Sequence, residues 1–253
     1  MHEVVRRSSP EAGLIIESVS ARRGGWPVLV DVSFEVRPGE IVAVIGPNGA
    51  GKTSLLEAVV GVLPLAEGCV RYQGQPIGGF RDRARVFAFM PDAAEPPAEV
   101  RVAAFIEHAR RSAGSTDAGD ELLAALTLTP LRSALVGELS RGEKRRLMLF
   151  GALCSDRPVV VLDEPLGVFD PLQLIGIVDV LRERARAGVS FLMSIHQMAD
   201  AEKIASRVVL LDSGRLIAVG TLPDLRAQIA CPTAPLEEVF LRILQTKVAH
   251  VAP

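Results

Sequence analysis

Residues 46–53 have the sequence GPNGAGKT, which combines the residue types needed to bind a chain of phosphates. In this pattern, GxxxxGK(S/T), glycines allow successive backbone N–H groups to curl around phosphate oxygens without a Cβ clash. Lys52 supplies a compact cation for the β- and γ-phosphates, and the Thr53 hydroxyl can ligate Mg²⁺. A Gly-rich turn with a surface lysine is the alternative, which the complete pattern disfavours. The predicted nucleotide-binding residues are therefore Gly46, Pro47, Asn48, Gly49, Ala50, Gly51, Lys52, Thr53 and Ser54.

Two adjacent carboxylates, Asp163 and Glu164, follow the apolar residues 159–162. Because side chains alternate along a strand, we expect these two to point in different directions. Asp163 can then face Mg²⁺ through a water molecule, since this ion keeps much of its hydration. Glu164 can face an attacking water as its base or orienting group. Acids also end apolar strands without a catalytic role, but the phosphate-binding pattern upstream favours the catalytic interpretation.

Short apolar runs are expected to form the strands that position these groups. Residues 41–45 and 159–162 are typical of strands buried on both faces of a parallel sheet, and 189–195 is a further strand. Helices are expected at residues 52–61, with one apolar face, and at 172–187. Since strand and helix alternate, the sequence predicts an α/β fold with a largely parallel sheet covered on both faces.

The rest of the chain is expected to add strands at its start and helices in its middle. Additional strands are predicted at residues 14–19, 28–36, 71–73, 86–89, 208–211 and 216–219, with a turn at 22–27. Between residues 92 and 155 the pattern becomes helical, with helices expected at 101–111 and 121–126. The predicted division is an α/β core at 14–91 and 156–220, a helical subdomain at 92–155 and a helical tail at 221–253.

Composition limits the classes of partner. The 253 residues carry a net charge of −2, so charge alone favours no contact with nucleic acid or anionic lipid. Three cysteines, Cys69, Cys154 and Cys231, lie too far apart to predict a zinc site or a disulfide framework. Because no apolar run approaches the ~18 residues of a membrane helix, any role at a membrane is expected to act through partners.

Three further segments resemble motifs of the ATP-binding subunits of ABC transporters. Residues 139–147, LSRGEKRRL, resemble the signature LSGGQ with its basic continuation. Residues 167–171, GVFDP, resemble the D-loop, and His196 in SIH resembles the switch histidine. The plainer alternatives are a helix start with a capping box formed by Ser140 and Glu143, and an ordinary histidine at a strand end. The order of all these motifs over residues 14–225 favours the family.

The resemblance implies a P-loop NTPase (RecA-like) core with an N-terminal antiparallel β subdomain and an inserted α-helical subdomain. It implies ATP and Mg²⁺ as cofactors, with hydrolysis driving a separate integral-membrane permease from the cytoplasmic face of the membrane. Two such subunits, identical or different, would meet head to tail, with Ser140 and Gly142 of one touching the γ-phosphate held by the other. By the same resemblance, Asp170 contacts the nucleotide, and Glu164 and His196 are catalytic.

The sequence departs from the family at several positions. Asp92 replaces a glutamine and is predicted as a possible Mg²⁺ ligand. Arg141 replaces the first signature glycine, and an acid replaces its glutamine. The acid at Asp92 and the basic residue at Arg141, with the C-terminal LEEVF, resemble drug, antibiotic and lipid exporters, and this resemblance points to export. Trp26 is the predicted adenine-stacking ring, although Arg23 is an alternative stacking group and Trp26 could equally be a partly buried turn residue.

Other functions remain open at this point. A non-transport ABC-type ATPase acting on DNA or on the ribosome would usually need a coiled-coil insertion or two nucleotide domains, and this chain shows neither. A regulatory subunit with weak ATPase activity is compatible with the departures in the motifs. A P-loop kinase would leave the signature-like residues 139–147 unexplained.

Overall fold

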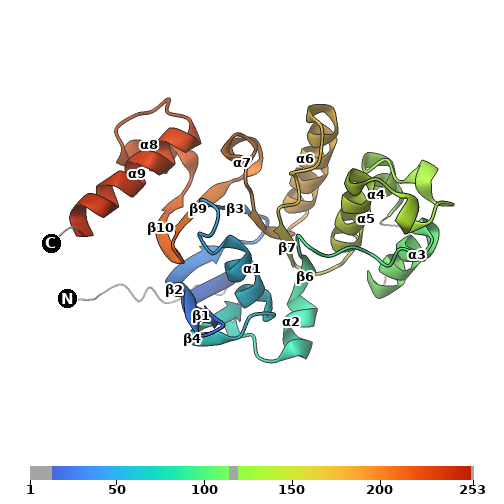
Figure 1. Ribbon diagram of the computed structural model, residues 1–253, viewed down its shortest axis with the longest axis horizontal. Coiled ribbons are helices and arrows are strands. Elements are labelled where there is room, and N and C mark those ends of the chain that lie inside the picture. The colour runs from blue at the N-terminus through green and yellow to red at the C-terminus, as the bar shows by residue number, and fades with distance from the viewer. Residues whose placement is uncertain (1–12, 114–118, 252–253) are drawn as a thin grey trace.

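The computed structural model of the chain describes residues 13–113 and 119–251 (Figure 1). The strands are β1 (Leu14–Arg23), β2 (Trp26–Val36), β3 (Ile41–Ile45), β4 (Leu65–Tyr72), β5 (Gln75–Pro76), β6 (Phe87–Met90), β7 (Val159–Asp163), β8 (Ser190–Ser194), β9 (Arg207–Asp212) and β10 (Arg215–Gly220). The α-helices are α1 (Lys52–Val60), α2 (Phe80–Val86), α3 (Val102–Ala113), α4 (Asp120–Ala125), α5 (Arg141–Leu153), α6 (Pro171–Arg186), α7 (Met198–Ile204), α8 (Leu222–Gln228) and α9 (Leu236–Val251). Two short 3₁₀ turns lie at Thr129–Leu131 and Val136–Glu138.

A six-stranded sheet forms the centre of the molecule, in the order β10-β9-β3-β8-β7-β6. Its strands β9, β3, β8, β7 and β6 run parallel, and β10 pairs with β9 in the antiparallel sense. Every residue of β3 is buried, with Ile41, Ala43 and Ile45 in one apolar core and Val42 and Val44 in the other. The α/β fold and the prediction of strands buried on both faces are therefore confirmed.

A four-stranded antiparallel sheet, in the order β2-β1-β4-β5, packs with α1 against the second of these cores. The turn between β1 and β2 is shorter than predicted, because Gly24 and Gly25 alone form it, with φ of 57° and 86°. Two glycines at positive φ allow a tight hairpin whose twist matches the flanking strands. The predicted glycine-containing turn is therefore confirmed, but its bounds of 22–27 were too wide, since Arg23 and Trp26 are paired strand residues.

The helices α3, α4 and α5 lie between β6 and β7 in the chain and sit at the opposite end of the molecule from α8 and α9 (Figure 1). The predicted helices at residues 101–111 and 121–126 are confirmed within two residues at each end. The seven-residue helices α2 and α7 were not predicted, because so short a segment shows little apolar periodicity. The division at residues 92, 156 and 221 stays a prediction. Among the helices that the structure describes, none combines the length and the apolar character that a membrane crossing requires.

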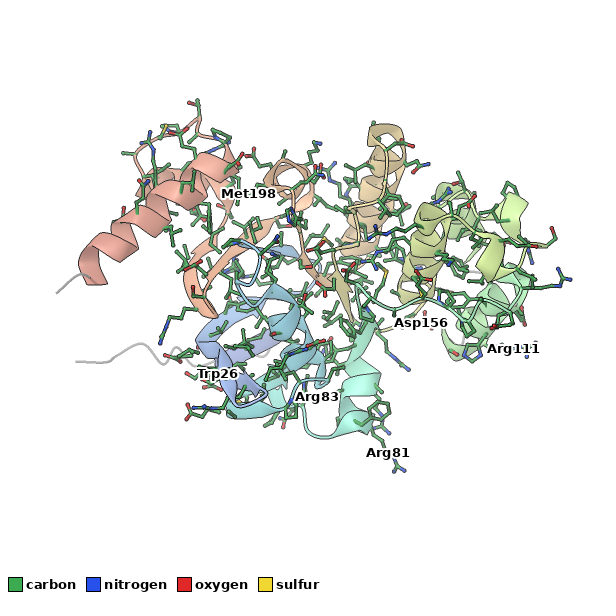
Figure 2. All side chains as sticks on the ribbon, viewed as in Figure 1. Trp26, Arg81, Arg83, Arg111, Asp156 and Met198 are labelled. Carbon is green, nitrogen blue, oxygen red and sulfur yellow. The ribbon has the colours of Figure 1, made fainter. Side chains whose placement is uncertain are left out.

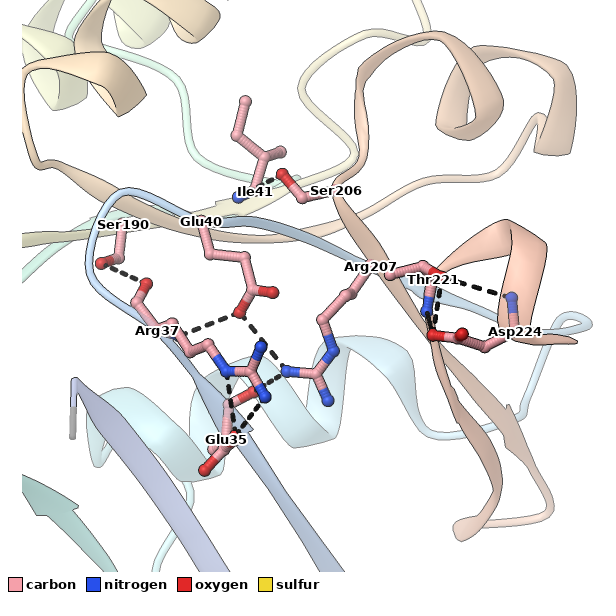
Figure 3. Close-up of polar contacts among 9 residues, drawn as sticks. All are labelled: Glu35, Arg37, Glu40, Ile41, Ser190, Ser206, Arg207, Thr221 and Asp224. Atoms are coloured by element: carbon pink, nitrogen blue, oxygen red, sulfur yellow. Dashed lines mark hydrogen bonds and ion pairs between the residues drawn. The ribbon is translucent and has the colours of Figure 1, made fainter. Parts of the chain in front are cut away.

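A polar network fixes the turn between β2 and β3 at the end of the sheet where β3 begins (Figure 3). Glu40, which is 9% exposed, accepts hydrogen bonds from the Arg37 N–H at 2.9 Å and from the Arg207 guanidinium at 3.4 Å. The Ser190 hydroxyl donates to the Arg37 carbonyl oxygen at 3.1 Å. These contacts join the turn to β8 and β9, and leave the opposite ends of the same strands to form the site.

Candidate active site

The loop of residues 46–51 follows β3 and leads directly into α1. Gly51 caps the N-terminus of α1 with φ +98°, and a Cβ there would lie 2.8 Å from the Val28 carbonyl oxygen. A Cβ at Gly46 would lie 2.1 Å from the Leu211 carbonyl oxygen. Glycine is thus needed at Gly46 for close packing against β9, in addition to the approach of phosphate that the sequence suggested.

A cavity of about 730 Å³ opens at the N-terminus of α1. Helix N-termini present unpaired N–H donors and a partial positive charge, which suits phosphate. Most of the predicted phosphate-binding residues meet here, together with Glu164 and residues from the β1–β2 and β9–β10 hairpins. The lining residues are Pro27, Val28, Asn48, Gly49, Ala50, Gly51, Lys52, Thr53, Ser54, Glu164, Ser213 and Gly214.

Lys52 is held within this loop and is 7% exposed. Its ammonium donates hydrogen bonds to the Gly46 carbonyl oxygen at 2.9 Å and to the Pro47 carbonyl oxygen at 3.2 Å. A buried ammonium needs such partners, since an unpaired charge away from water is costly. The cation is therefore already positioned at the cavity, and Gly46 and Pro47 contribute to the site by holding it.

The carboxylates at the end of β7 have different surroundings. Asp163 is 1% exposed, and its Oδ1 accepts a hydrogen bond from the Ser194 hydroxyl at 2.5 Å. Its Oδ2 is buried and has no hydrogen-bond partner among the described residues. A buried oxygen of this kind is rare in proteins and fits a metal ion or a metal-bound water.

Glu164 leaves the strand at this point, with φ +49°. Strand alternation, from which the two acids were expected to point in different directions, does not apply here, since β7 ends at Asp163 and Glu164 adopts a left-handed conformation. The Glu164 N–H donates to the Ser194 hydroxyl oxygen at 2.8 Å. Non-glycine residues in this conformation are uncommon and cluster at functional sites.

Glu164 lies at the junction of three cavities. Besides the large one, it lines a cavity of about 140 Å³ with His196 and Asp200, and one of about 120 Å³ with Asp92 and Arg145. His196 is exposed and lies just past the end of β8. The tertiary structure therefore brings the predicted catalytic residues Glu164 and His196 to one cavity, whose lining does not include Lys52.

Several predicted site residues do not line the large cavity. Trp26 is 78% exposed on the antiparallel sheet, where Figure 2 shows it beside the β1–β2 hairpin. Asp92 lies 3.4 Å from the Arg145 guanidinium. Asp170 accepts the Gln173 N–H at 2.9 Å, as expected of a residue at the start of α6. Gly142 lies in the first turn of α5. The roles of these residues toward nucleotide or Mg²⁺ stay predictions.

The predicted capping box at the start of α5 is confirmed. Ser140 is the N-cap, and its hydroxyl oxygen accepts the Glu143 N–H at 3.3 Å. The Ser140 N–H and hydroxyl both lie within hydrogen-bond distance of Glu143 Oε2, at 2.8 and 2.7 Å. Hydrogen bonds from the Ser140 hydroxyl and N–H lower the pKa of Glu143, with a smaller effect from Arg146. Glu143 thus replaces the family's glutamine with a charged group that orders this helix start.

Four residues of the site were missed by sequence reasoning. Ser194 and Arg145 contact the acids, and Ser213 and Gly214 line the large cavity. A serine at the end of the apolar run FLMS was a signal for the first, since polar residues are rare inside such strands. For Ser213 and Gly214 the placement of the β9–β10 hairpin decides the contact, and for Arg145 the packing of α5 against the ends of β6 and β7 decides it, so no local pattern indicates these residues.

Replacing Ser194 by Ala is expected to lower the free energy of unfolding by about 1–3 kcal/mol, because the Glu164 N–H loses its acceptor. Misplacement of the acids should also lower kcat for ATP hydrolysis about tenfold. Urea denaturation and a steady-state phosphate-release assay measure the two effects.

Ser190→Ala is the matched control for this change, because Ser190 is a buried serine at the other end of β8 that bonds to the Arg37 carbonyl oxygen. It should lower stability without lowering kcat. Equal kcat values for the two variants would contradict a role for Ser194 in positioning the acids.

Comparisons with known proteins agree with the motifs. Residues 29–167 match the family model described as ABC transporter. The Hemin import ATP-binding protein HmuV of Streptomyces coelicolor is 36% identical, over 81% of this chain and 76% of its own length. The Nod factor export ATP-binding protein I of Paraburkholderia xenovorans is 35% identical, over 88% of this chain and 75% of its own length.

A solved structure of the ATP binding subunit of an ABC transporter superposes with a TM-score of 0.84 at 29% identity, covering 91% of this chain and 99% of that chain. Both the sequence and the fold are therefore shared over most of the length. The chain belongs to the ABC transporter family, as an ATP-binding subunit that uses ATP and Mg²⁺ and hydrolyses ATP.

Proposed function

We propose that this chain hydrolyses ATP to drive a separate integral-membrane permease, and that it does so as a head-to-tail dimer. The observation that carries the proposal is the convergence of Lys52, Thr53 and Glu164 on one cavity, with the unpartnered Asp163 Oδ2 buried beside Glu164. A phosphate chain, a divalent cation and an attacking water need this set of groups.

The residues of the large cavity have distinct roles in this proposal. The loop from Gly46 to Ser54 holds the phosphates through backbone N–H groups and the Lys52 ammonium. Thr53 and Asp163 hold Mg²⁺, directly or through water, and the ion neutralises charge on the phosphates when it is bound. Glu164 accepts a proton from the attacking water or orients it.

His196 lines a smaller cavity together with Glu164, which supports its proposed contact with the same reacting region. Asp92 also lines a cavity with Glu164, so it stays a possible ligand of Mg²⁺ or of its water. The Asp92 carboxylate lies 3.4 Å from the Arg145 guanidinium, so Mg²⁺ would compete with Arg145 for this carboxylate.

Dimerisation is proposed because some residues that are expected to contact the nucleotide do not line the large cavity. Ser140, Gly142 and Asp170 are absent from its described lining residues. A second subunit could bring its own copies of these three residues to the open side of the cavity. The subunits could be identical or different. Trp26, which is exposed, is proposed to stack on the adenine ring.

The permease is proposed to place the chain at the cytoplasmic face of the membrane. The segment between β6 and α3 is largely exposed, including Asp92, Ala93, Glu95 and Pro97, and it is our proposed contact for the permease. The relatives include ATP-binding proteins named for import and for export. Export therefore stays a prediction, which rests on the departures at Asp92 and Arg141.

Purification of the tagged chain from detergent-solubilised membranes tests this proposal. We expect an integral-membrane protein to be recovered in a fixed ratio to the chain, and to change its rate of ATP hydrolysis when the two are mixed. A washed soluble fraction provides the control. Recovery with ribosomes or DNA, and with no membrane protein, would support the non-transport alternative and contradict a role in transport.

A further inference from the structure

Arg145 of α5 contacts two segments that the proposed chemistry uses. One nitrogen of its guanidinium, Nη1, donates to the carbonyl oxygens of Asp92 at 2.9 Å and Pro91 at 3.3 Å. The other, Nη2, donates to the carbonyl oxygens of Asp163 and of Glu164, the latter at 2.8 Å. The side chain is only 8% exposed. The planar guanidinium of Arg145 therefore donates hydrogen bonds to four backbone carbonyl oxygens at once.

The two segments lie side by side because β6 and β7 are parallel neighbours, with Met90 paired to Leu162. Both strands end at this edge of the sheet, where Asp163 is the last residue of β7 and Pro91, Asp92 and Glu164 follow the strand ends. A buried guanidinium can satisfy several carbonyl oxygens together, which a shorter or neutral side chain cannot. The helical region thereby contacts the end of each strand through one residue.

Glu164 needs support of this kind. Its left-handed backbone is costly for a residue with a Cβ and persists only where surrounding contacts determine it. The Ser194 hydroxyl holds the Glu164 N–H, and Arg145 holds the Glu164 carbonyl oxygen. Both polar groups of this residue's backbone are thus bound by side chains from other elements, β8 and α5.

The neighbouring arginine provides a contrast within the same helix. Arg146 is also largely buried, with 13% of its side chain exposed. Its guanidinium donates to the Leu126 carbonyl oxygen at 3.2 Å and to the Thr127 hydroxyl. It also lies 4.0 Å from the Glu143 carboxylate. All these partners belong to the region between β6 and β7, so Arg146 stabilises that region, and among the described residues its hydrogen bonds go to neither Asp163 nor Glu164.

We propose that Arg145 is a positioning residue, which holds the Glu164 turn in place and ties it to the Pro91–Asp92 segment. Movement of α5 relative to the sheet would then change the direction of the Glu164 carboxylate. This inference rests on the proposed role of Glu164 in hydrolysis. Arg145 itself contacts backbone oxygens and the Asp92 carboxylate, and it need not contact the nucleotide.

The variant Arg145→Lys tests the proposal, with Arg146→Lys as the matched control. Lysine keeps the charge but loses the planar fork, so it cannot bond four carbonyl oxygens in this arrangement. In the nucleotide-free chain, we expect hydrogen exchange in Arg145→Lys to become faster at Glu164 and at residues 166–168, and also at residues 92–95. In Arg146→Lys, faster exchange is expected near residues 126–128, with at most a small change at the start of α5, where Arg146 lies 4.0 Å from Glu143, and with none at Glu164 or residues 166–168.

The kinetic expectation separates positioning from general stability. We expect Arg145→Lys to lower kcat about 10- to 100-fold, since small misplacement of a catalytic group has effects of this size, with the dissociation constant for ATP unchanged within about twofold. Arg146→Lys should lower the melting temperature and leave kcat of the folded protein near that of the parent chain. Arg145→Gln, which keeps two planar N–H donors, repeats both measurements if the lysine variant does not fold.

The proposal is overturned if Arg145→Lys shows parental hydrogen exchange at both segments, or if it and Arg146→Lys lower kcat equally. Failure of the proposed function would be seen in a different variant. Glu164→Gln would then hydrolyse ATP at the parental rate, whatever the exchange rates of the Arg145 variants.

Discussion

Replacing Glu164 by Gln is expected to slow ATP hydrolysis by about 100-fold or more, because general-base catalysis contributes on the order of 10²–10⁴ in rate. Glutamine has nearly the same shape but cannot accept a proton at neutral pH. The backbone contacts of this residue with Ser194 and Arg145 do not involve its side chain, so the fold should persist. ATP binding should therefore continue, and the ATP-bound dimer should accumulate. Phosphate release and size-exclusion chromatography with Mg²⁺ and ATP measure the two outcomes.

Glu121→Gln is the control for this change, because Glu121 is an exposed glutamate of α4. It removes the same charge and should leave hydrolysis and oligomeric state as they are in the parent chain. If Glu164→Gln hydrolyses ATP at the parental rate, the assignment of Glu164 as the base is wrong. If it hydrolyses slowly but remains a monomer with ATP, the proposal of an ATP-stabilised dimer is wrong.

Replacing Lys52 by Ala is expected to weaken binding of ATP by about 100-fold or more, which corresponds to about 2.8 kcal/mol. Lys52 is 7% exposed, and two carbonyl oxygens already hold its ammonium in the loop, so its attraction for phosphate is only weakly screened by water. The change removes this cation from a cavity that Glu164 also lines. Isothermal titration calorimetry with ATP and Mg²⁺ measures the affinity.

Lys203→Ala tests whether the loss is specific to the loop. Lys203 lies on α7, is 60% exposed and pairs with Asp200 at 3.0 Å. It carries the same charge at a surface position, and its removal should change the affinity for ATP by less than about twofold. Thermal unfolding of Lys52→Ala must show a folded protein. A folded Lys52→Ala variant with parental affinity would contradict the proposed phosphate site.

Much of the local structure could be predicted from the sequence. The strand Ile41–Ile45 matches its prediction at both ends, and α1 begins at the predicted residue, Lys52. Both follow from signals within a few residues, namely a short apolar run, the glycines that end it and the apolar face of the next helix. The capping box of Ser140 and Glu143 was predictable for the same reason, since its partners are three residues apart.

Two predictions, the bounds of the β1–β2 turn and the strand geometry at Glu164, differ from the structure because the backbone there has positive φ. The residues Gly24 and Gly25 made a shorter turn than the polar segment around them suggested, because two adjacent residues with positive φ suffice to reverse the chain. The alternation of side chains along a strand holds only to Asp163, the last residue of β7, because the chain leaves the strand at Glu164 in a left-handed turn. Contacts from Ser194 and Arg145 determine that turn, and neither is near Glu164 in the sequence.

The sequence by itself determined the chemistry of this protein: a phosphate-binding loop, a pair of acids and the family to which their order belongs. Only the tertiary structure decided which side chains surround the acids. Ser194 meets Asp163 because β7 and β8 are paired in register, and Gly214 meets the loop because β9 lies beside β3. The strand order β9-β3-β8-β7-β6 differs from the order along the chain. This order is favoured because it lets helices bury the apolar residues on both faces of the sheet. Local hydrogen bonds and apolar periodicity depend on residues a few positions apart, whereas the strand order depends on the packing of the whole chain.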